Sequence, residues 1–317
     1  MKGLSTFAGF GGSSTGYKRA GFEMLAAIEW NKYAADCYKL NHPSTNVFCE
    51  DISKLNLFKL QQELNIDEGE LDLIDGSPPC QGFSLAGERK MNDDRNYLFW
   101  SHLKVIKHFK PKSIVVENVQ GMISGKMKHI AKKVYNELEN AGYNVNVAVI
   151  RGTQFGVPQN RPRVFFVGLR KDFKKKYSFP THKIKPIMPK YLLKNVKPVT
   201  TMNLRTDTQF YEIVTKTKPG DQLNKILIKL GLKEKYFNTF KLHPLKVCPT
   251  IVKTNAFLHW NNRYLSVEEA LVLTGFSQHY KFSGKSFVKN WERIGNCVIP
   301  NVSHAIGEGI IKQLSLK

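Results

Sequence analysis

Short apolar segments alternate with amphipathic segments over residues 1–170, and this alternation constrains the fold more than any other feature. Apolar runs of about four to eight residues between turn residues are typical of buried strands, and apolar side chains about three or four positions apart are typical of helices. Strands that alternate with helices form parallel sheets with helices on both faces. The sequence therefore predicts an α/β fold built on a doubly wound, mostly parallel sheet.

Seven strands and six helices are predicted from these patterns. The strands are expected at residues 4–7, 23–28, 46–48, 71–74, 113–116, 144–150 and 164–169. The helices are expected at residues 14–20, 33–41, 97–109, 127–141, 266–273 and 302–314. Gly142 stands where the C-cap of the helix at 127–141 is expected. Ser266 with Glu269 three positions later is a capping-box pattern that predicts the start of a helix.

The character of the chain changes after Lys171. Residues 171–255 are rich in Lys, Pro, Thr and Asn and have weak periodicity, and a helical pattern returns at Ser266. We therefore predict a first domain at 1–174, followed by a second, smaller and irregular domain that carries much of the basic surface. A solvated charge run is the alternative explanation for the lysines of the middle segment.

Composition limits the class of protein. The chain has 48 Lys and Arg against 26 Asp and Glu, a net charge of +22, which favours a polyanionic partner such as nucleic acid over a merely solubilising surface. Five cysteines without paired or metal-ligand spacing predict a reducing compartment and no disulfide framework. No apolar run approaches the roughly 18 residues of a membrane span, and the early first strand argues against a signal peptide.

A cysteine lies where such a sheet binds ligands. Cys80 stands in GSPPCQGFS at residues 76–84, directly after the predicted strand at 71–74. Two prolines end strand pairing and stiffen the loop, and ligands bind outside the carboxyl ends of strands in open α/β sheets. Glu117 follows the predicted strand at 113–116. A thiol and a carboxylic acid on strand ends predict covalent catalysis, and the alternative is a buried structural Cys80 with a surface Glu117.

The first strand leads into a glycine-rich turn, FAGFGG, at residues 7–12. Glycine lets the backbone approach a ligand closely. Glu29 lies twenty positions after Gly9, and an acid at about that offset commonly holds ribose hydroxyls. Because the spacing is not GxGxxG, a mononucleoside such as S-adenosylmethionine fits better than a dinucleotide. We expect Trp30 to face the adenine and Asp51 to accept from its amino group; the alternatives are a core Trp and surface acids.

Together these segments resemble the cytosine-C5 DNA methyltransferases. The resemblance is collinear across the chain apart from roughly residues 175–245. The segments that carry it are FAGFGG at 7–12, Glu29-Trp30, Asp51-Ile52, PPCQGFS at 78–84, Glu117-Asn118-Val119, QNRPR at 159–163, RYLSVEEA at 263–270 and GNCVIPNV at 295–302. Cys297 stands where the family usually carries Ser, a small change that puts little in doubt.

The resemblance implies a class I methyltransferase fold of Rossmann type, with a catalytic and cofactor-binding domain at 1–174 and target recognition at 175–262. It also implies a return segment at 263–317 that completes the catalytic domain. It implies S-adenosylmethionine as cofactor, S-adenosylhomocysteine as its product, and no metal. The catalytic residues it implies are Cys80, Glu117, Arg161 and Arg163. The cofactor-binding residues it implies are Phe7, Ala8, Gly9, Phe10, Gly11, Gly12, Glu29, Trp30, Asp51, Ile52, Ser77, Pro79, Leu98, Asn296 and Val298.

The implied chemistry suits these residue types. A Cys80 thiolate that adds to C6 of cytosine makes C5 nucleophilic, and Glu117 can donate a proton to N3. Arg163, with Arg161 behind it, can hold the cytosine O2 and the carboxylate through fixed donors. A duplex buries the base, so the enzyme must flip it out, and residues 84–95 can form a loop that closes over it.

The expected partner is double-stranded DNA of a specific short sequence. We expect a restriction–modification role, with a cognate restriction endonuclease that acts on the same site. We also expect a monomer in the prokaryotic cytoplasm, near the nucleoid, with no membrane partner. Three alternatives stay open. One is the tRNA-methylating branch of the family, whose usual Cys-Phe-Thr signature is absent. The others are an inactive DNA-binding paralogue and an unrelated cofactor-binding enzyme with a reactive cysteine.

Overall fold

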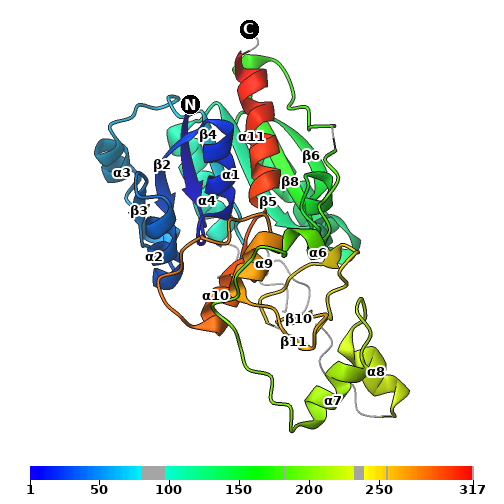
Figure 1. The fold of residues 1–317 in the computed structure, drawn as a ribbon. Helices are drawn as coiled ribbons and strands as arrows, with labels where there is room; N and C mark the ends of the chain where they lie inside the picture. The colour runs from blue at the N-terminus through cyan, green and yellow to red at the C-terminus, as the bar shows by residue number, and fades with distance from the viewer. Residues whose placement is uncertain (80–96, 182, 232–238, 255, 316–317) are drawn as a thin grey trace. The chain divides into compact units, whose positions relative to one another are not determined.

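The structure is a computed structural model of the 317-residue chain. It describes residues 1–79, 97–181, 183–231, 239–254 and 256–315 (Figure 1). The chain divides into two compact units. The first contains Met1–Ile150, Pro162–Thr181 and Val302–Lys317, and the second contains Arg151–Arg161 and His182–Asn301. The functional boundaries at 174 and 262 stay a prediction.

A seven-stranded sheet forms the centre of the first unit, in the order β3-β2-β1-β4-β5-β8-β6. Its strands are β1 Lys2–Thr6, β2 Glu23–Ile28, β3 Asn46–Phe48, β4 Leu73–Gly76, β5 Ser113–Val119, β6 Tyr143–Arg151 and β8 Pro162–Arg170. The pairs β1–β2, β1–β4, β2–β3 and β4–β5 are parallel, and β5–β8 is antiparallel. The predicted mostly parallel α/β sheet is confirmed.

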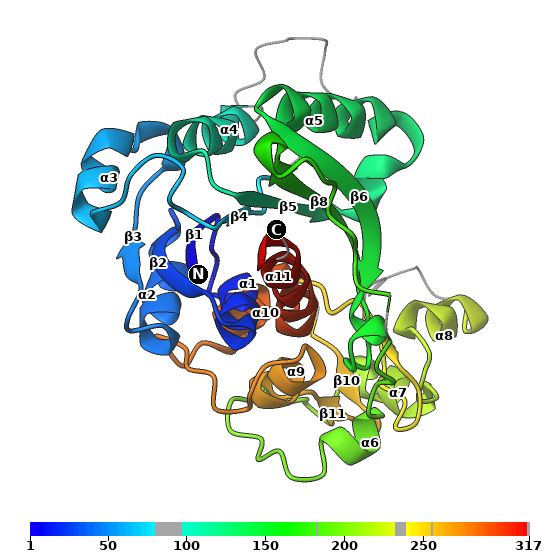
Figure 2. The same cartoon turned by 90° about the horizontal axis from the view of Figure 1, so that it is seen from above.

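Helices cover both faces of this sheet. They are α1 Gly12–Ala20, α2 Lys32–Asn41, α3 Leu57–Leu64, α4 Tyr97–Phe109, α5 Lys128–Asn140 and α11 Pro300–Ser315. Figure 2 shows α4 and α5 on one face and α1 and α11 on the other. The helix α3 has no counterpart among the predicted helices. Short 3-10 turns lie at Ile52–Lys54, Gln120–Ile123, Gly125–Met127, Gly152–Gln154 and Lys171–Phe173.

The main core forms between the sheet and the α4–α5 layer. Leu4, Ile74 and Ile114 occupy matching positions on three neighbouring strands and are fully buried with Leu103 and Ile106 of α4. Successive residues of a strand point to opposite faces of a sheet, so every second residue of each strand points toward α4 and α5. Complete burial of such side chains contributes about 1.5–3 kcal/mol each. The apolar runs of the sequence thus become the centre of the fold.

On the opposite face α11 lies close to α1. A Cβ at Gly307 would stand 2.9 Å from the Cβ of Ala20 and 3.1 Å from Cδ1 of Tyr17. Those distances are shorter than ordinary van der Waals contact, so a larger residue at Gly307 would separate the two helices. The Tyr177 hydroxyl donates to the carbonyl of Ile306 at 3.0 Å and ties the segment that follows β8 to α11.

The second unit has short elements and a small core of its own. Its helices are α6 Pro189–Leu192, α7 Gln209–Lys216, α8 Leu223–Lys229, α9 Val267–Leu273 and α10 Phe287–Asn296. Its strands pair as β7 Gln159–Asn160 with β9 Cys248–Pro249, and β10 Leu258–His259 with β11 Arg263–Tyr264. Ile213, Val214, Leu223, Leu227 and Leu258 form a buried cluster between α7, α8 and β10. The capping box of Ser266 and Glu269 is confirmed at the start of α9.

Candidate functional site

One edge of the sheet carries most of the predicted site residues of the first unit. Phe7 follows β1, Glu29 follows β2, Asp51 follows β3, and Ser77 follows β4. Glu117 lies near the end of β5, which is parallel to β4. The carboxyl ends of parallel strands meet at one edge, where ligands of open α/β sheets bind. The topology therefore brings residues 110 positions apart in the chain to the same face of the unit.

The glycine turn after β1 is held by the Glu29 carboxylate. Oε2 of Glu29 accepts from the Gly9 amide and Oε1 from the Asn31 amide, both at 2.8 Å. Gly9 has φ of +56°, and a Cβ built there meets nothing within 4 Å, so the space over this backbone is open. Gly11, with φ of +100°, is the N-cap of α1. The turn leaves open space for a ligand directly beside a buried carboxylate.

Trp30 and Asp51 complete a set of groups suited to a nucleoside. The Trp30 side chain is 75% exposed and offers a flat apolar surface beside Glu29. Asp51 Oδ1 accepts from the amide and hydroxyl of Ser53 and caps a 3-10 turn. Each carboxylate oxygen has two lone pairs, so Glu29 and Asp51 can accept further bonds from ribose hydroxyls or an adenine amino group.

Other predicted cofactor residues are placed differently. The side chains of Ala8, Phe10 and Ile52 are buried in the protein, so a ligand contact from them would come through the backbone. Phe7 has φ of +51° and lies at the start of the turn. Leu98 lies on α4 and packs partly buried against the main core, rather than on a strand end. The cofactor roles of these residues stay predictions.

The loop after β4 begins within the described residues and is anchored to β5. Asn118 donates from Nδ2 to the carbonyl of Pro78 at 2.9 Å and is itself buried. Ser77 is half-buried and Pro79 exposed. The predicted nucleophile Cys80 lies outside the described residues, as does the predicted closing loop at 84–95. The described part of this loop therefore ends at Pro79, one residue before Cys80. Asn118 holds this part against β5, the strand that carries Glu117.

Glu117 and Arg163 form an ion pair at this edge. Nε of Arg163 lies 3.0 Å from Oε1 of Glu117, and the two side chains are 17% and 12% exposed. Antiparallel pairing of β5 with β8 places Phe165 opposite Glu117 and Arg163 opposite Val119. Nη1 of Arg163 donates to the carbonyl of Pro162 at 2.8 Å, which fixes the guanidinium. The predicted pairing of this acid with this arginine is present in the structure.

Arg161 has a different environment although it lies only two residues from Arg163. Its Nη1 and Nη2 donate to the carbonyls of Ile251 and Gly295 at 3.0 and 2.8 Å, and the side chain is 3% exposed. Gln159 is also buried, accepts from the Ile251 amide and donates to the Thr274 hydroxyl. These contacts hold segments of the second unit together. The catalytic role of Arg161 stays a prediction, and its contacts favour a supporting one.

The predicted cofactor residues near the C-terminus lie at the end of α10. Asn296 is exposed and Val298 half-buried. A Cβ at the preceding Gly295 would lie 2.5 Å from the Cα of Lys253, so only glycine lets α10 approach that segment so closely. These residues belong to the second unit, and their cofactor roles stay predictions.

A buried acid lies on β4 beneath the loop that leads to Cys80. Asp75 is 4% exposed. Burial raises the pKa of Asp75 to about 7, and the nearby Glu117 charge acts in the same direction. Asp75, Asn118 and Gln159 are not among the residues predicted from the sequence. Asn118 and Gln159 lie inside motifs given above, next to Glu117 and near Arg161. This proximity in the sequence is the feature from which their roles could be predicted.

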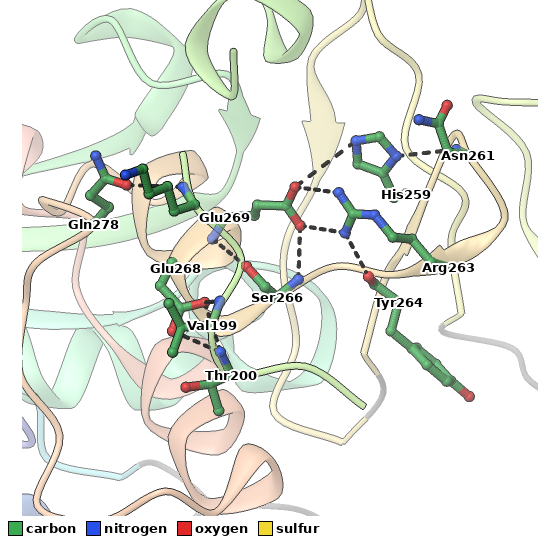
Figure 3. A network of polar contacts seen from close by, with 11 residues as sticks. Val199, Thr200, His259, Asn261, Arg263, Tyr264, Ser266, Glu268, Glu269 and Gln278 are labelled. Carbon is green, nitrogen blue, oxygen red and sulfur yellow. Dashed lines mark hydrogen bonds and ion pairs between the residues drawn. The ribbon is translucent and has the colours of Figure 1, made fainter. Parts of the chain in front are cut away.

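The segment predicted to recognise the target is held to the first turn of α9 at two places, at Val199 and Thr200 within it and at Arg263 directly after it. Figure 3 shows the two adjacent glutamates that do this. Glu268 accepts from the amides of Val199 and Thr200 at 3.0 and 3.1 Å. Glu269 is buried and binds Arg263 through both carboxylate oxygens, at 2.8 and 2.6 Å. Residues 201–262 therefore lie between the contacts of Glu268 and those of Glu269.

His259 lies on the leaving side of the same network. Its Nε2 is 4.0 Å from Oε1 of Glu269, and its Nδ1 accepts from the Asn261 amide at 3.1 Å (Figure 3). Burial lowers the pKa of His259 to about 4, and Arg263 acts in the same direction. The ring is therefore neutral near pH 7, and it braces the turn between β10 and β11 as an acceptor.

Two further features bear on the type of site. Within the described ranges, no group of three or more His, Cys, Asp or Glu side chains is arranged to hold a metal ion. No helix among the residues that the structure describes is long and apolar enough to cross a membrane.

Comparison with known proteins gives consistent matches over nearly the whole chain. A family model described as C-5 cytosine-specific DNA methylase matches residues 1–312. The Type II methyltransferase M.DdeI of Desulfomicrobium norvegicum is 31% identical, over 98% of this chain and 88% of its own length. The Type II methyltransferase M.FnuDI of Fusobacterium nucleatum is 30% identical, over 100% and 96%. The crystal structure of a DNA modification methyltransferase encoded within an E. coli prophage has a TM-score of 0.78 at 26% identity, over 99% of both chains.

Proposed function

The chain belongs to the family of C-5 cytosine-specific DNA methylases, and from that premise we propose that it acts on a short specific sequence of duplex DNA through a covalent bond between Cys80 and C6 of the cytosine. Its activity is that of the family: it is a DNA methyltransferase that uses S-adenosylmethionine and modifies C5 of cytosine. The covalent step, the roles of individual residues and the specific target sequence belong to the proposal.

The observation that carries the proposed mechanism is the Glu117–Arg163 pair. Glu117 lies on β5, beside the strand β4 whose end leads through Ser77 toward Cys80. A carboxylic acid so placed can reach the N3 and N4 edge of a cytosine whose C6 faces Cys80. Arg163 holds the carboxylate through a fixed guanidinium donor, which orients it at little cost during the reaction.

The covalent step balances with these groups. The Cys80 thiolate forms a bond to C6, the ring electron pair moves toward N3, and N3 takes a proton from Glu117. C5 is then nucleophilic and would take the methyl group from the sulfonium of S-adenosylmethionine; the broken bond's electron pair would stay on sulfur, leaving S-adenosylhomocysteine. Afterwards C5 loses its proton to water, the electron pair re-forms the C5–C6 double bond, and Cys80 leaves as thiolate. The N3 proton returns to Glu117.

The proposed cofactor site fits its ligand by the chemistry of its groups. Open space lies over Gly9, where a Cβ would find no neighbour, and a nucleoside can approach that backbone. Glu29 would take the ribose hydroxyls, Trp30 the adenine face and Asp51 the adenine amino group. The remaining predicted contacts, including those of Asn296 and Val298, belong to this proposal.

Access to the base requires that it leave the helix stack. C5 and C6 of a paired cytosine are shielded above and below, so we propose base flipping, at a cost of a few kcal/mol. We assign recognition of the DNA sequence to residues 175–262, supported by the separate core of that region and its attachment at Glu268 and Glu269. The names of the relatives, Type II methyltransferases of bacteria, support a restriction–modification role. A cognate endonuclease and a location in the prokaryotic cytoplasm belong to the proposal.

The activity is tested by expressing the protein in a host that lacks cytosine methylation. We expect bisulfite sequencing of the host DNA to reveal 5-methylcytosine at one short recurring sequence. Purified protein should label duplex DNA from radioactive S-adenosylmethionine, and a tRNA pool serves as the competing substrate. Methylation of tRNA alone, or of adenine N6 or cytosine N4, would contradict the proposal.

The recognition segment predicts the outcome of an exchange experiment. Residues 201–258 lie between the two attachment points, so they can be replaced by the matching segment of a relative with another target while Glu268 and Glu269 stay in place. We expect the methylated sequence to change to that of the donor, because base edges are read there. An exchange of residues 97–150 is the control and should keep the original target. A chimera of 201–258 that still methylated the original sequence would place recognition elsewhere.

A further inference from the structure

A buried histidine on α4 lies beneath both loops of the proposed site. His102 is completely buried, and its Nδ1 lies 2.8 Å from Oγ1 of Thr6, the last residue of β1. The same Thr6 hydroxyl lies 3.3 Å from the carbonyl of Asp75, on the neighbouring strand β4. His102 thereby connects α4 to β1 and, through the Thr6 hydroxyl, to β4. Each of these strands leads directly into a functional loop.

The direction of these hydrogen bonds can be assigned. Burial lowers the pKa of His102 to about 3, so the ring is neutral and carries one N–H. With the hydrogen on Nδ1, His102 donates to Thr6, and the Thr6 hydroxyl can donate to the Asp75 carbonyl. Nε2 has no hydrogen-bond partner among the described residues. The Nδ1–H tautomer therefore avoids a buried N–H without an acceptor, which is the costlier arrangement.

The same ring lies against Gly76 at the end of β4 and beside Phe7 at the start of the glycine turn. A Cβ at Gly76, the last residue of β4, would lie 2.6 Å from Cε1 of His102, so the strand passes directly against the imidazole. The Phe7 ring lies edge-on to His102 with the ring centroids 6.4 Å apart. Phe7 also has φ of +51°, a strained conformation for a residue with a side chain that the surroundings must hold in place. A shift of His102 would therefore displace both Phe7 and Gly76, and with them the start of each loop.

We propose that His102 is a positioning residue that holds the cofactor turn after Phe7 and the segment Gly76–Pro79, which precedes Cys80, in one fixed geometry. The proposal rests on the function proposed above, since it assigns roles to those two loops. His102 is not proposed to touch the base or the cofactor. It acts through Thr6, Phe7 and Gly76, whose backbones set where the loops leave the sheet.

Replacement of His102 by phenylalanine removes the ring nitrogens but keeps an aromatic ring in the same space. We expect the rate of covalent adduct formation with 5-fluorocytosine DNA to fall about 10- to 100-fold, because small misplacements of reacting groups have effects of this size. The affinity for S-adenosylhomocysteine, measured by calorimetry, should fall several-fold, and the KM for DNA should change little. His102→Asn places an amide N–H near the position of Nδ1 and should recover much of both losses.

Two further variants make the test specific. Thr6→Val removes the hydroxyl, and the double variant with His102→Phe should be no worse than either single variant, because both break one chain of bonds. His108→Phe is the matched control. His108 lies further along the same helix and packs on Phe58 and Phe109. That variant should keep wild-type adduct rate and cofactor affinity.

The outcomes separate this proposal from the proposed function. If the wild-type protein forms the adduct but His102→Phe matches it in rate and in S-adenosylhomocysteine affinity, the positioning role is wrong. Additive losses in the double variant also overturn it. If the wild-type protein binds S-adenosylhomocysteine yet forms no adduct, the covalent mechanism is wrong, while the calorimetric comparison still decides the role of His102. If His102→Phe does not fold, Thr6→Val and His102→Asn give the same comparison.

Discussion

Replacement of Cys80 by serine is expected to abolish methyl transfer while S-adenosylhomocysteine binding stays near wild type. A thiolate is available near neutral pH and is intrinsically nucleophilic, whereas a serine hydroxyl without an adjacent base is a weak nucleophile. Without the bond to C6, cytosine C5 cannot accept the methyl group at a useful rate. The measurement is methyl incorporation into duplex DNA, combined with calorimetry of cofactor binding. Retained binding shows that the variant is folded and that the loss is chemical.

A trapping experiment identifies the nucleophile independently. DNA with 5-fluorocytosine at the target should form a stable adduct, because fluorine at C5 cannot leave as a proton does. Peptide mapping should locate the adduct at Cys80. Among the other cysteines, Cys37, Cys248 and Cys297 are buried and only Cys49 is exposed. Cys49→Ser is therefore the matched control and should trap as the wild type does.

Mapping of the adduct to another cysteine would contradict the assignment of Cys80. Cys248 is the least suited alternative, since burial raises the pKa of Cys248 to about 12 and its thiolate is scarce at neutral pH. An adduct at Cys49 would move the nucleophile to the end of β3, beside Trp30, whose carbonyl lies 3.9 Å from the Cys49 sulfur. That outcome would also require a new account of the cofactor site.

The sheet could be predicted from sequence because most residues of its central strands β1, β4, β5 and β8 are buried. Parallel strands covered by helices read as continuous apolar runs, and each of the predicted runs became a strand of the seven-stranded sheet. The ends were less predictable. The run at 113–116 became a strand that continues to Val119, because pairing with β8 carries the polar residues Glu117 and Asn118 along. A ladder of backbone bonds does not end where apolar side chains do.

The second unit was less accessible to sequence reasoning. The helices α7, α8 and α10 were not predicted, although Ser286 and Thr208 cap two of them. Their short lengths give few periodic positions, and α8 is stabilised through the small cluster that includes Leu223 and Leu227. Helices of one or two turns depend on such tertiary contacts more than on propensity. The middle segment therefore read as irregular.

Individual site residues show where a motif stops being informative. Arg161 and Arg163 lie in one motif and were assigned together. In the structure Arg163 pairs with Glu117, while Arg161 binds two backbone carbonyls of the second unit. Their difference arises from which segments pack around each guanidinium, and spacing in the sequence does not encode that. His102 was hidden for a similar reason, since a histidine on the buried face of a helix looks like any core residue until its partner Thr6 is located.

The second large effect is expected for Glu117→Gln. Glutamine has nearly the same shape, and its amide oxygen can still accept from Nε of Arg163, 3.0 Å from the carboxylate oxygen in the structure. Its amide can also donate a hydrogen bond to N3 of cytosine, so the base should still bind. It cannot transfer a proton to N3. We therefore expect kcat to fall by about 10²- to 10⁴-fold, the usual contribution of general acid catalysis.

Two measurements separate this loss from a structural one. The free energy of unfolding should fall by no more than about 1–3 kcal/mol, because glutamine keeps the hydrogen bond to Arg163 although it removes the opposite charge from this largely buried pair. The adduct with 5-fluorocytosine DNA should still form at Cys80, with the same mass but at a rate reduced in proportion to kcat, since the proton is needed when the thiolate adds to C6. The matched control is Glu139→Gln, a carboxylate on α5 that accepts from the Val145 amide. It should retain wild-type kcat. A Glu117→Gln variant within threefold of wild type would remove Glu117 as the acid and leave N3 protonation to another group.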